Sequence, residues 1–313
     1  MSERFRTLFR VLDESFHESI EGIREFAVAA TNVGQAVAHF GLTAAYFTPL
    51  YREPGIESID AIDRIIGSKD DVDGPLLTAH RLVKFYVISS GDALLSACDL
   101  VGRDFPMHVG SGALARVAAE HASKAMFLAD PAIDWRARVL RTYGLFRSAL
   151  QEYRSSNDEG STKLIDDWKR WRDRTGSEFT DVPKQPSSSS RKLIAAHFGS
   201  DLGYDELSRP THGNAVWMTL AVIQEQKGTN FMWSTTLRNV QFAMDVCISA
   251  SDRLCRLWNL DHDDVLRALS ERQSLEPISW KTLCERCDWV RAGVEHLSAN
   301  VVVDWAEDPQ PPR

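Results

Sequence analysis

Residues 233–258 read WSTTLRNVQFAMDVCISASDRLCRLW, and this stretch decides the fold class. Side chains that suit a protein core recur in it every three or four residues, at Trp233, Leu237, Val240, Met244, Cys247, Ser251, Leu254 and Trp258. That spacing places them on one face of an α-helix. A stripe of this length is typical of a helix that packs in an antiparallel bundle.

The same period recurs over residues 16–37, 80–101 and 135–153. Asp73-Gly74-Pro75 and Asp130-Pro131 precede two of these stripes, and proline suits a first helical turn because its missing N–H would be unpaired there. No alternating run rich in Val, Ile or Thr is bounded by hairpin turns, so nothing supports strands. We therefore expect an all-α fold, an antiparallel multi-helix bundle, with helix in more than about half of the residues.

One segment interrupts the helical pattern. Residues 175–190 contain two prolines and four consecutive serines, which indicate a flexible connecting loop. It separates an N-terminal helical half, 1–174, from a C-terminal half, 191–303, and residues 304–313 are expected to form a disordered tail. Because the helices on both sides need partners for their apolar stripes, we expect both halves to pack into one composite bundle.

Net charge and cysteine content indicate which partners and which cellular compartment to expect. The chain has 36 basic and 44 acidic residues, a net charge of −8, which disfavours indiscriminate binding to polyanions. Any contact with nucleic acid must then be local. Five scattered cysteines are too few for a disulfide framework, and the first ten residues carry charges where a signal peptide needs an apolar run. We expect a cytoplasmic protein.

Residues 26–51 contain no Asp, Glu, Lys or Arg, and a stretch of that length could cross a bilayer. It carries a line of polar side chains that would be costly against lipid, namely Asn32, Gln35, His39, Thr43 and Tyr46. We therefore expect a buried central helix and no membrane span. The polar line either satisfies its own hydrogen bonds or lines a small-molecule pocket that includes His39.

Residues 204–213, YDELSRPTHG, gather the most polar chemistry. Tyr204, Ser208 and His212 stand at i, i+4 and i+8, which is one helical face. Because Pro210 interrupts this run, we expect a short helix to end near Ser208 and a new one to start at Pro210, with His212 in its first turn. A helix amino terminus favours a neutral imidazole and attracts phosphate. The alternative is that the three side chains only hydrogen-bond to one another and to helix ends.

A second constellation begins with Arg116, Glu120 and Lys124, spaced by four, and continues with Arg138 and Arg141 on the next expected helix. The link between the two helices is short enough for a helical hairpin. Glu120 could then point inward and pair with Arg138 or Arg141 as a buried ion pair. The alternative is a set of solvated i,i+4 pairs on the surface.

The remaining motifs give weaker evidence about function. Residues 168–174, WKRWRDR, interleave basic and aromatic side chains, which suits phosphates and stacked bases but is also the pattern of an exposed amphipathic helix. Cys284 and Cys287 lack a second ligand pair at zinc spacing. No glycine-rich phosphate loop, nucleophile elbow or His-Glu-x-x-His helix occurs. We predict no metal and no cofactor.

Three spacings carry a resemblance: Arg116-x-x-x-Glu120, Arg138-x-x-Arg141 and Tyr204-x-x-Leu207-Ser208-x-x-x-His212. They resemble a group of uncharacterised all-helical bacterial proteins with a Tyr-x-x-Leu-Ser-x-x-x-His signature. More distantly, a bundle with a histidine at the start of a late helix is similar to the HEPN superfamily of metal-independent ribonucleases and their inactive relatives. The motif of that superfamily separates arginine and histidine by four to six residues, whereas two residues separate Arg209 from His212.

Two functions follow as hypotheses. The first is a non-catalytic soluble binding or scaffold protein with a polar ligand pocket around His212, to which Arg116, Glu120, Arg138, Arg141 and His39 contribute. The alternative is a HEPN-like metal-independent ribonuclease or phosphate-handling enzyme. In that case His212 is the acid or base, assisted by Tyr204, Ser208 and Arg209. The expected partners are a second copy of the chain in a homodimer and an RNA or small phosphate-containing ligand.

Overall fold

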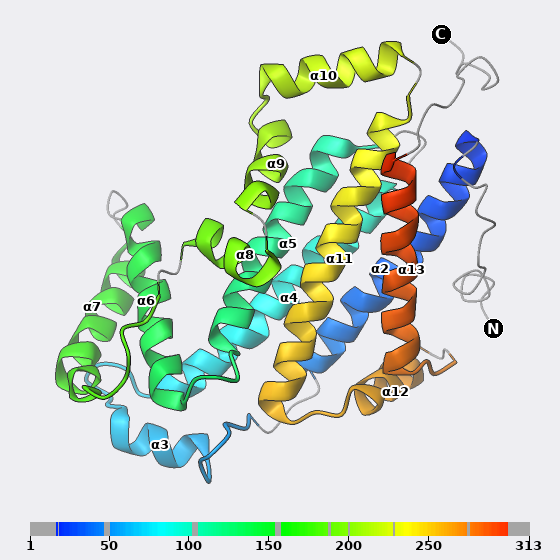
Figure 1. Cartoon of the computed structure of the whole chain (residues 1–313). Helices are drawn as coiled ribbons and strands as arrows, with labels where there is room; N and C mark the ends of the chain where they lie inside the picture. The colour runs from blue at the N-terminus through cyan, green and yellow to red at the C-terminus, as the bar shows by residue number, and fades with distance from the viewer. Residues whose placement is uncertain are drawn as a thin grey trace.

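The structure is a computed structural model that describes residue 17 and residues 19–46, 51–101, 106–153, 158–186, 189–199, 201–227, 229–273 and 276–299. Within these residues it contains twelve α-helices and no strand (Figure 1). The all-α prediction is therefore confirmed, with helix in more than half of the chain. The tail predicted at 304–313 lies outside the described residues.

The helices follow one another in the order that Figure 1 labels. Their bounds are α2 (Ile20–Tyr46), α3 (Ile59–Ile66), α4 (Pro75–Val101), α5 (His108–Leu128), α6 (Trp135–Tyr153), α7 (Glu159–Arg174), α8 (Ser190–Phe198), α9 (Asp201–Thr211), α10 (Ala215–Gln226), α11 (Phe231–Trp258), α12 (His262–Gln273) and α13 (Trp280–Ala299). None of them, within the part of the chain that the structure covers, has both the length and the apolar character needed to cross a bilayer.

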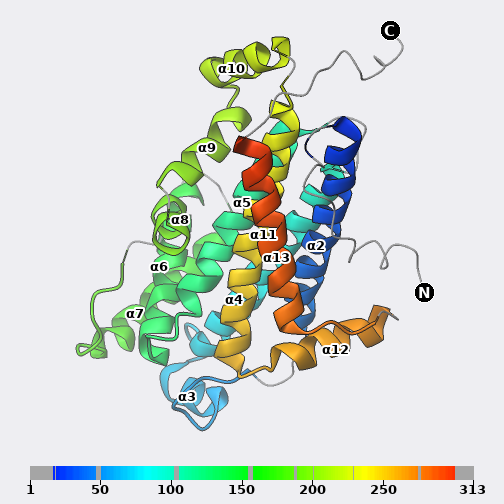
Figure 2. The ribbon, with the colours of Figure 1, turned by 45° about the vertical axis from the view of Figure 1, so that its right-hand side comes forward.

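The main core surrounds α11, which packs against α2, α4, α5 and α13 (Figures 1 and 2). All eight positions of the stripe from Trp233 to Trp258 are buried, as their spacing predicts. Burying one large apolar side chain contributes about 1.5–3 kcal/mol, so this stripe is a major source of stability. Helix α2, which contains residues 26–46 of the charge-free stretch, packs into the same core.

Small residues let the central helices approach one another closely. A Cβ atom added to Gly34 would lie 2.7 Å from Cys98 Sγ, and one added to Gly41 would lie 2.5 Å from Ser251 Oγ. Helix α5 contributes a buried stripe of Ala115, Ala118, Ala119, Ala122 and Ala125. The small volume of these residues brings α5 close to both α4 and α11, and it fixes the position from which α5 presents its polar residues.

A smaller hydrophobic cluster joins α3, α4, α6 and α7. Trp168 and Trp171 are almost fully buried in it, and Trp171 Nε1 donates a hydrogen bond to the Ile66 carbonyl at 2.9 Å. The basic and aromatic stretch 168–174 is therefore one amphipathic helix whose two tryptophan rings face the core. Those rings are not available to stack on bases.

The predicted helix starts are confirmed at Pro75 but not at Pro131. Helix α6 begins at Trp135, and the Asp134 carboxylate accepts a hydrogen bond from the Ala137 amide at 2.9 Å. Asp134 is thus the residue that caps this helix. Asp130 instead accepts from the Ala132 amide at 3.0 Å in the preceding turn. Helix α6 therefore starts directly after the capping carboxylate of Asp134 and not at Pro131.

Helix α10 lies at one end of the molecule, away from the main core (Figures 1 and 2). Its apolar side chains are largely exposed, including Val216, Met218, Leu220, Val222 and Ile223. Trp217 is its main attachment, since this ring stacks on His108 and packs against Phe231. α10 therefore depends on few contacts with the rest of the protein.

Candidate functional site

Four side chains from α5 and α9 form one hydrogen-bonded group, which we call the surface cluster: Arg116, Glu120, Tyr204 and His212. Arg116 Nε donates to Glu120 Oε1 at 2.8 Å, its Nη2 donates to the Tyr204 hydroxyl at 2.5 Å, and its Nη1 lies 3.3 Å from His212 Nε2. The Arg116 guanidinium also lies 4.7 Å from the centre of the Tyr204 ring. Arg116 thus connects residues that are about ninety positions apart in the chain.

The packing of α9 on α5 positions this cluster. Tyr204, Leu207, Ser208 and Thr211 stand at i, i+3, i+4 and i+7 and face the bundle, with Leu207 only 6% exposed. The α9 backbone lies close to Gly112 of α5, since a Cβ added there would be in ordinary van der Waals contact with the Leu207 carbonyl oxygen at 4.0 Å. Tyr204 consequently reaches Arg116.

His212 lies at the end of α9, not in the first turn of a new helix. α9 continues through Pro210. The Gly213 amide then donates to the Pro210 carbonyl at 3.1 Å and the Asn214 amide to the Arg209 carbonyl at 3.1 Å, with Gly213 at φ +61°. These bonds form a Schellman motif, in which glycine adopts the left-handed conformation that ends a helix. The predicted helix start at Pro210 is wrong because the glycine, not the proline, ends α9.

The next helix starts at Asn214, whose side-chain oxygen accepts from the Trp217 amide at 3.1 Å as an N-cap. His212 therefore stands at a helix carboxyl end, which carries partial negative charge rather than the positive charge that we expected. Any attraction of an anion to His212 has to come from neighbouring side chains.

The hydrogen bond to Arg116 fixes the tautomer of His212. A guanidinium has only donors, so His212 Nε2 must accept, and the ring proton of a neutral imidazole lies on Nδ1. The His212 side chain is exposed and borders an open pocket of about 270 Å³, lined by Asp205, Ser208, Arg209, His212 and Asn214. Asp205 pairs with Arg191 at 2.8 Å. Arg209 is exposed and has no ion-pair partner among the described residues.

Ser208 shares the helix and the pocket with His212 but is not hydrogen-bonded to it in the described structure. Its hydroxyl donates to the Tyr204 carbonyl at 2.7 Å, one turn back in the same helix. A serine nucleophile requires a base within hydrogen-bond reach. The arrangement therefore gives Ser208 a place in the pocket wall without the contact that would activate it.

Arg138 belongs to a different group, which we call the buried cluster: Glu53, His80, Arg138 and Trp258. Arg138 donates to both carboxylate oxygens of Glu53, at 2.8 and 3.0 Å, and also to the Leu128 carbonyl. His80 Nε2 lies 2.8 Å from Glu53, and Trp258 Nε1 donates to His80 Nδ1 at 3.1 Å. The predicted pairing of Glu120 with Arg138 or Arg141 is wrong, because Glu120 pairs with Arg116 in its own helix and Arg138 pairs with Glu53, which lies between α2 and α3.

Protonation in the buried cluster follows from these contacts. Trp258 can only donate, so His80 Nδ1 accepts and His80 Nε2 carries the proton that it donates to Glu53. Burial lowers the pKa of His80 and outweighs the contact with Glu53. Burial alone would raise the pKa of Glu53, but the hydrogen bonds from His80 and Arg138 outweigh it and leave that pKa below its usual value. A neutral imidazole and one ion pair are thus enclosed.

Arg141 and His39 each lie apart from both clusters. Arg141 donates to the Phe127 carbonyl at 2.6 Å, to Asp130 at 3.0 Å and to Gln185 at 2.8 Å. Burial lowers its pKa. His39 is half-buried on α2, which lies on the far side of α11 from α9 (Figures 1 and 2), and burial lowers its pKa. The expected convergence therefore holds for Glu120, Tyr204 and His212 and fails for Arg138 and Arg141.

Sequence reasoning missed Glu53 and treated His80 only as one position of an apolar stripe. A histidine within such a stripe is a usable signal, because a buried imidazole needs polar partners. Nothing in the sequence identifies those partners, since Arg138 lies 85 residues from Glu53 and Trp258 lies 178 residues from His80.

Within the described residues no group of three or more His, Cys, Asp or Glu side chains is arranged to hold a metal ion. All five cysteines are free, and burial raises the pKa of Cys247 and Cys255 to about 12, so these two are inert thiols. Comparison of the chain with known proteins found no matching family model, no matching curated protein and no matching solved structure.

Proposed function

We propose that this chain is a helical binding protein that holds a phosphate-bearing ligand at the surface cluster. The observation that carries the proposal is that Arg116, fixed by Glu120 and Tyr204, contacts an exposed His212. His212 borders a pocket together with Arg209, which has no ion-pair partner among the described residues. One cation and an imidazole thus border the opening, and a second cation, Arg116, lies directly behind the imidazole. A preorganised guanidinium matches the geometry of phosphate oxygens.

The donors available at this pocket support an anionic ligand. Arg116 uses three of its five N–H groups within the cluster and keeps the others. Arg209 donates no hydrogen bond to another described residue, and the His212 ring offers Nδ1–H. Arg191 balances Asp205, the one carboxylate in the pocket wall. The ligand-facing charge is therefore positive although the whole chain carries −8.

A second candidate function is metal-independent cleavage of RNA, and one contact favours it. His212 Nε2 carries a lone pair and lies 3.3 Å from an Arg116 nitrogen. If bound RNA displaced that contact, the imidazole would be a general base. The neighbouring Arg116 guanidinium would then stabilise the negative charge that develops on the phosphoryl oxygens. Such catalysis typically contributes about 10²–10⁴-fold in rate.

The expected homodimer stays a prediction, and sedimentation of the purified chain would measure its oligomeric state.

Binding and cleavage of labelled single-stranded RNA separate the two functions. For the binding protein, Arg209→Ala should weaken RNA affinity about tenfold, as loss of a charge-assisted hydrogen bond implies, and wild type should leave the RNA intact. For the ribonuclease, wild type should cut RNA in EDTA and His212→Ala should not. Arg267→Ala is the matched control, because Arg267 is exposed and pairs with Asp264 on α12. RNA and inorganic phosphate that both fail to bind wild type would contradict the proposal.

A further inference from the structure

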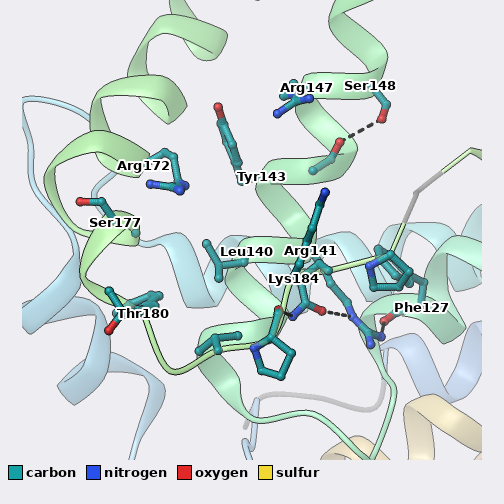
Figure 3. Close-up of a pocket in the computed structure, with 17 residues that line it drawn as sticks. Phe127, Leu140, Arg141, Tyr143, Arg147, Ser148, Arg172, Ser177, Thr180 and Lys184 are labelled. Carbon is teal, nitrogen blue, oxygen red and sulfur yellow. Dashed lines mark hydrogen bonds between the residues drawn. The ribbon is translucent and has the colours of Figure 1, made fainter.

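A large cavity lies between α6, α7 and the segment 176–186, away from both clusters (Figure 3). Its volume is about 1140 Å³. Four cationic side chains line it: Arg141, Arg147, Arg172 and Lys184. In Figure 3, Arg147, Arg172 and Lys184 surround the ring of Tyr143. No carboxylate is among the residues that line the cavity.

Only one of the four cations of this cavity has a partner among the described residues. Arg141 is held by Asp130 and by the Phe127 carbonyl. Arg147, Arg172 and Lys184, in contrast, have no ion-pair or hydrogen-bond partner within the described part of the chain. Three unneutralised cations around one ring repel each other, and that arrangement costs stability unless an anion is present. In a chain with eight more acidic than basic residues, such a concentration of positive charge is not a product of composition.

The neighbouring cavity differs from the first because its walls contain carboxylates. It has a volume of about 550 Å³ and shares the segment 182–186 with the first. Its walls contain three carboxylates, Asp130, Asp134 and Asp181, and three cations, Arg136, Arg141 and Lys184. Arg136 pairs with Asp134 and Asp181, and Arg141 pairs with Asp130. The segment 182–186 therefore lies between a cavity whose charges balance and a basic one. The basic side is the one without internal counter-charges.

The fold builds the basic cavity from three elements. Tyr143 and Arg147 stand at i and i+4 on one face of α6, and Arg172 projects from the last turn of α7. Lys184 comes from the segment expected to be a flexible connection, and Gln185 ties this segment to Arg141 at 2.8 Å. The cavity of about 1140 Å³ is slightly larger than a typical ligand pocket of about 300–1,000 Å³, and a concave site of this size suits a small molecule better than a polymer.

We propose that this cavity binds a small molecule that carries several phosphate groups. The guanidinium groups of Arg147 and Arg172 and the Lys184 ammonium each bind phosphoryl oxygens, and Tyr143 and Phe179 provide aromatic surface for the remainder of the ligand. The site is separate from the surface cluster, so it stands or falls independently of the function proposed there.

Calorimetric titration with ATP and with tripolyphosphate, both without added metal, tests this site. Both probes should bind wild type, and binding should weaken as salt concentration rises. The double variant Arg147→Ala and Arg172→Ala should raise the dissociation constant about tenfold or more. Lys169→Ala is the matched control, since Lys169 lies on the same α7 and pairs with Asp166 outside the cavity, and it should change the constant less than about twofold.

A second measurement on wild type avoids any effect of substitution on folding. ATP should slow acylation of the Lys184 amine, quantified by mass spectrometry, and should leave the Lys169 amine as reactive as before. Tighter binding of ATP than of tripolyphosphate would show that the aromatic surface contributes. The proposal is overturned if neither probe binds, if binding survives the double variant at full strength, or if single-stranded RNA protects Lys184 while ATP does not.

Discussion

The buried cluster and the surface cluster contain the same kinds of side chain: an arginine, a glutamate, a histidine and an aromatic ring that hydrogen-bonds through its polar atom. Their depth differs. Arg138 and Glu53 are each 1% exposed, whereas Arg116 and Glu120 are each 25% exposed. The comparison teaches that residue types alone do not separate a structural polar network from a candidate ligand site. Access to solvent separates them.

Depth also changes what each contact contributes to stability. In the buried cluster, removal of one partner leaves a charge without water or counter-charge, which costs about 3–5 kcal/mol. In the surface cluster, water replaces the lost partner, and an ion pair contributes about 1 kcal/mol or less. The following substitutions test this contrast in order of decreasing effect.

The largest effect is expected for Arg138→Met, which leaves the Glu53 carboxylate buried beside a neutral side chain. We expect the free energy of unfolding to fall by about 3–5 kcal/mol in urea titrations. Arg136→Met is the matched control two residues earlier, where the arginine pairs with Asp134 and Asp181 at the surface, and it should cost much less because water replaces the lost partner. Equal losses for the two variants would contradict the contrast in depth.

A smaller, pH-dependent loss is expected for His80→Gln. Burial holds the pKa of His80 below its ordinary value of 6.5. As the pH falls through 6.5, the His80 side chain therefore stays neutral in the folded protein but takes up a proton in the unfolded chain. Stability from His80 is thus present above pH 6.5 and is lost as the pH falls toward the lowered pKa.

Unfolding of wild type and His80→Gln at several pH values measures this loss. The variant should be about 1–3 kcal/mol less stable near neutral pH, because Trp258 and Glu53 each lose a partner. The difference between the two proteins should shrink as the pH falls below 6.5. A constant difference down to about pH 5 would show that His80 does not titrate as its burial implies.

Arg116→Met should cost about 1 kcal/mol or less, although it removes the bonds to Glu120, Tyr204 and His212 together. Its main expected effect is on the position of α9. Hydrogen exchange in α9 would record that change. The fluorescence of Trp217 would also record it, measured in a background in which the other tryptophans are replaced. A loss above about 3 kcal/mol would place the surface cluster in the same class as the buried one.

His212→Ala should have the smallest effect on stability, within about 0.5 kcal/mol, because the side chain is exposed at a helix end. The same variant is the decisive one for RNA cleavage. A strong effect on ligand or substrate with none on the thermal midpoint would separate function from stability at this residue. A drop of several degrees in the midpoint would mean that the imidazole is structural.

The helical fold could be predicted because local periodicity records it. The stripe from Trp233 to Trp258 repeats at 3.6 residues, and each of its positions is buried. Caps are equally local: Asp261 and Ser279 accept hydrogen bonds from the first amides of α12 and α13. Such features need only neighbours within one helical turn.

The polar clusters could be predicted only in part, because their partners are far apart in the chain. Spacing correctly grouped Tyr204 with His212 on α9, but it could not tell whether Glu120 pairs with Arg116 in its own helix or with an arginine on the next one. Glu53 has no distinguishing local pattern at all. The helix end near His212 was misjudged because Pro210 was given more weight than Gly213.

The exposed position of α10 has a consequence for local opening. Its apolar side chains face water, with Val216 71% and Leu220 51% exposed, so its unfolding releases little buried surface. The amide hydrogens of α10 should therefore exchange with deuterium long before those of α11, whose opening requires the core itself to separate. A protease would cut there first and leave two fragments still held together by the bundle.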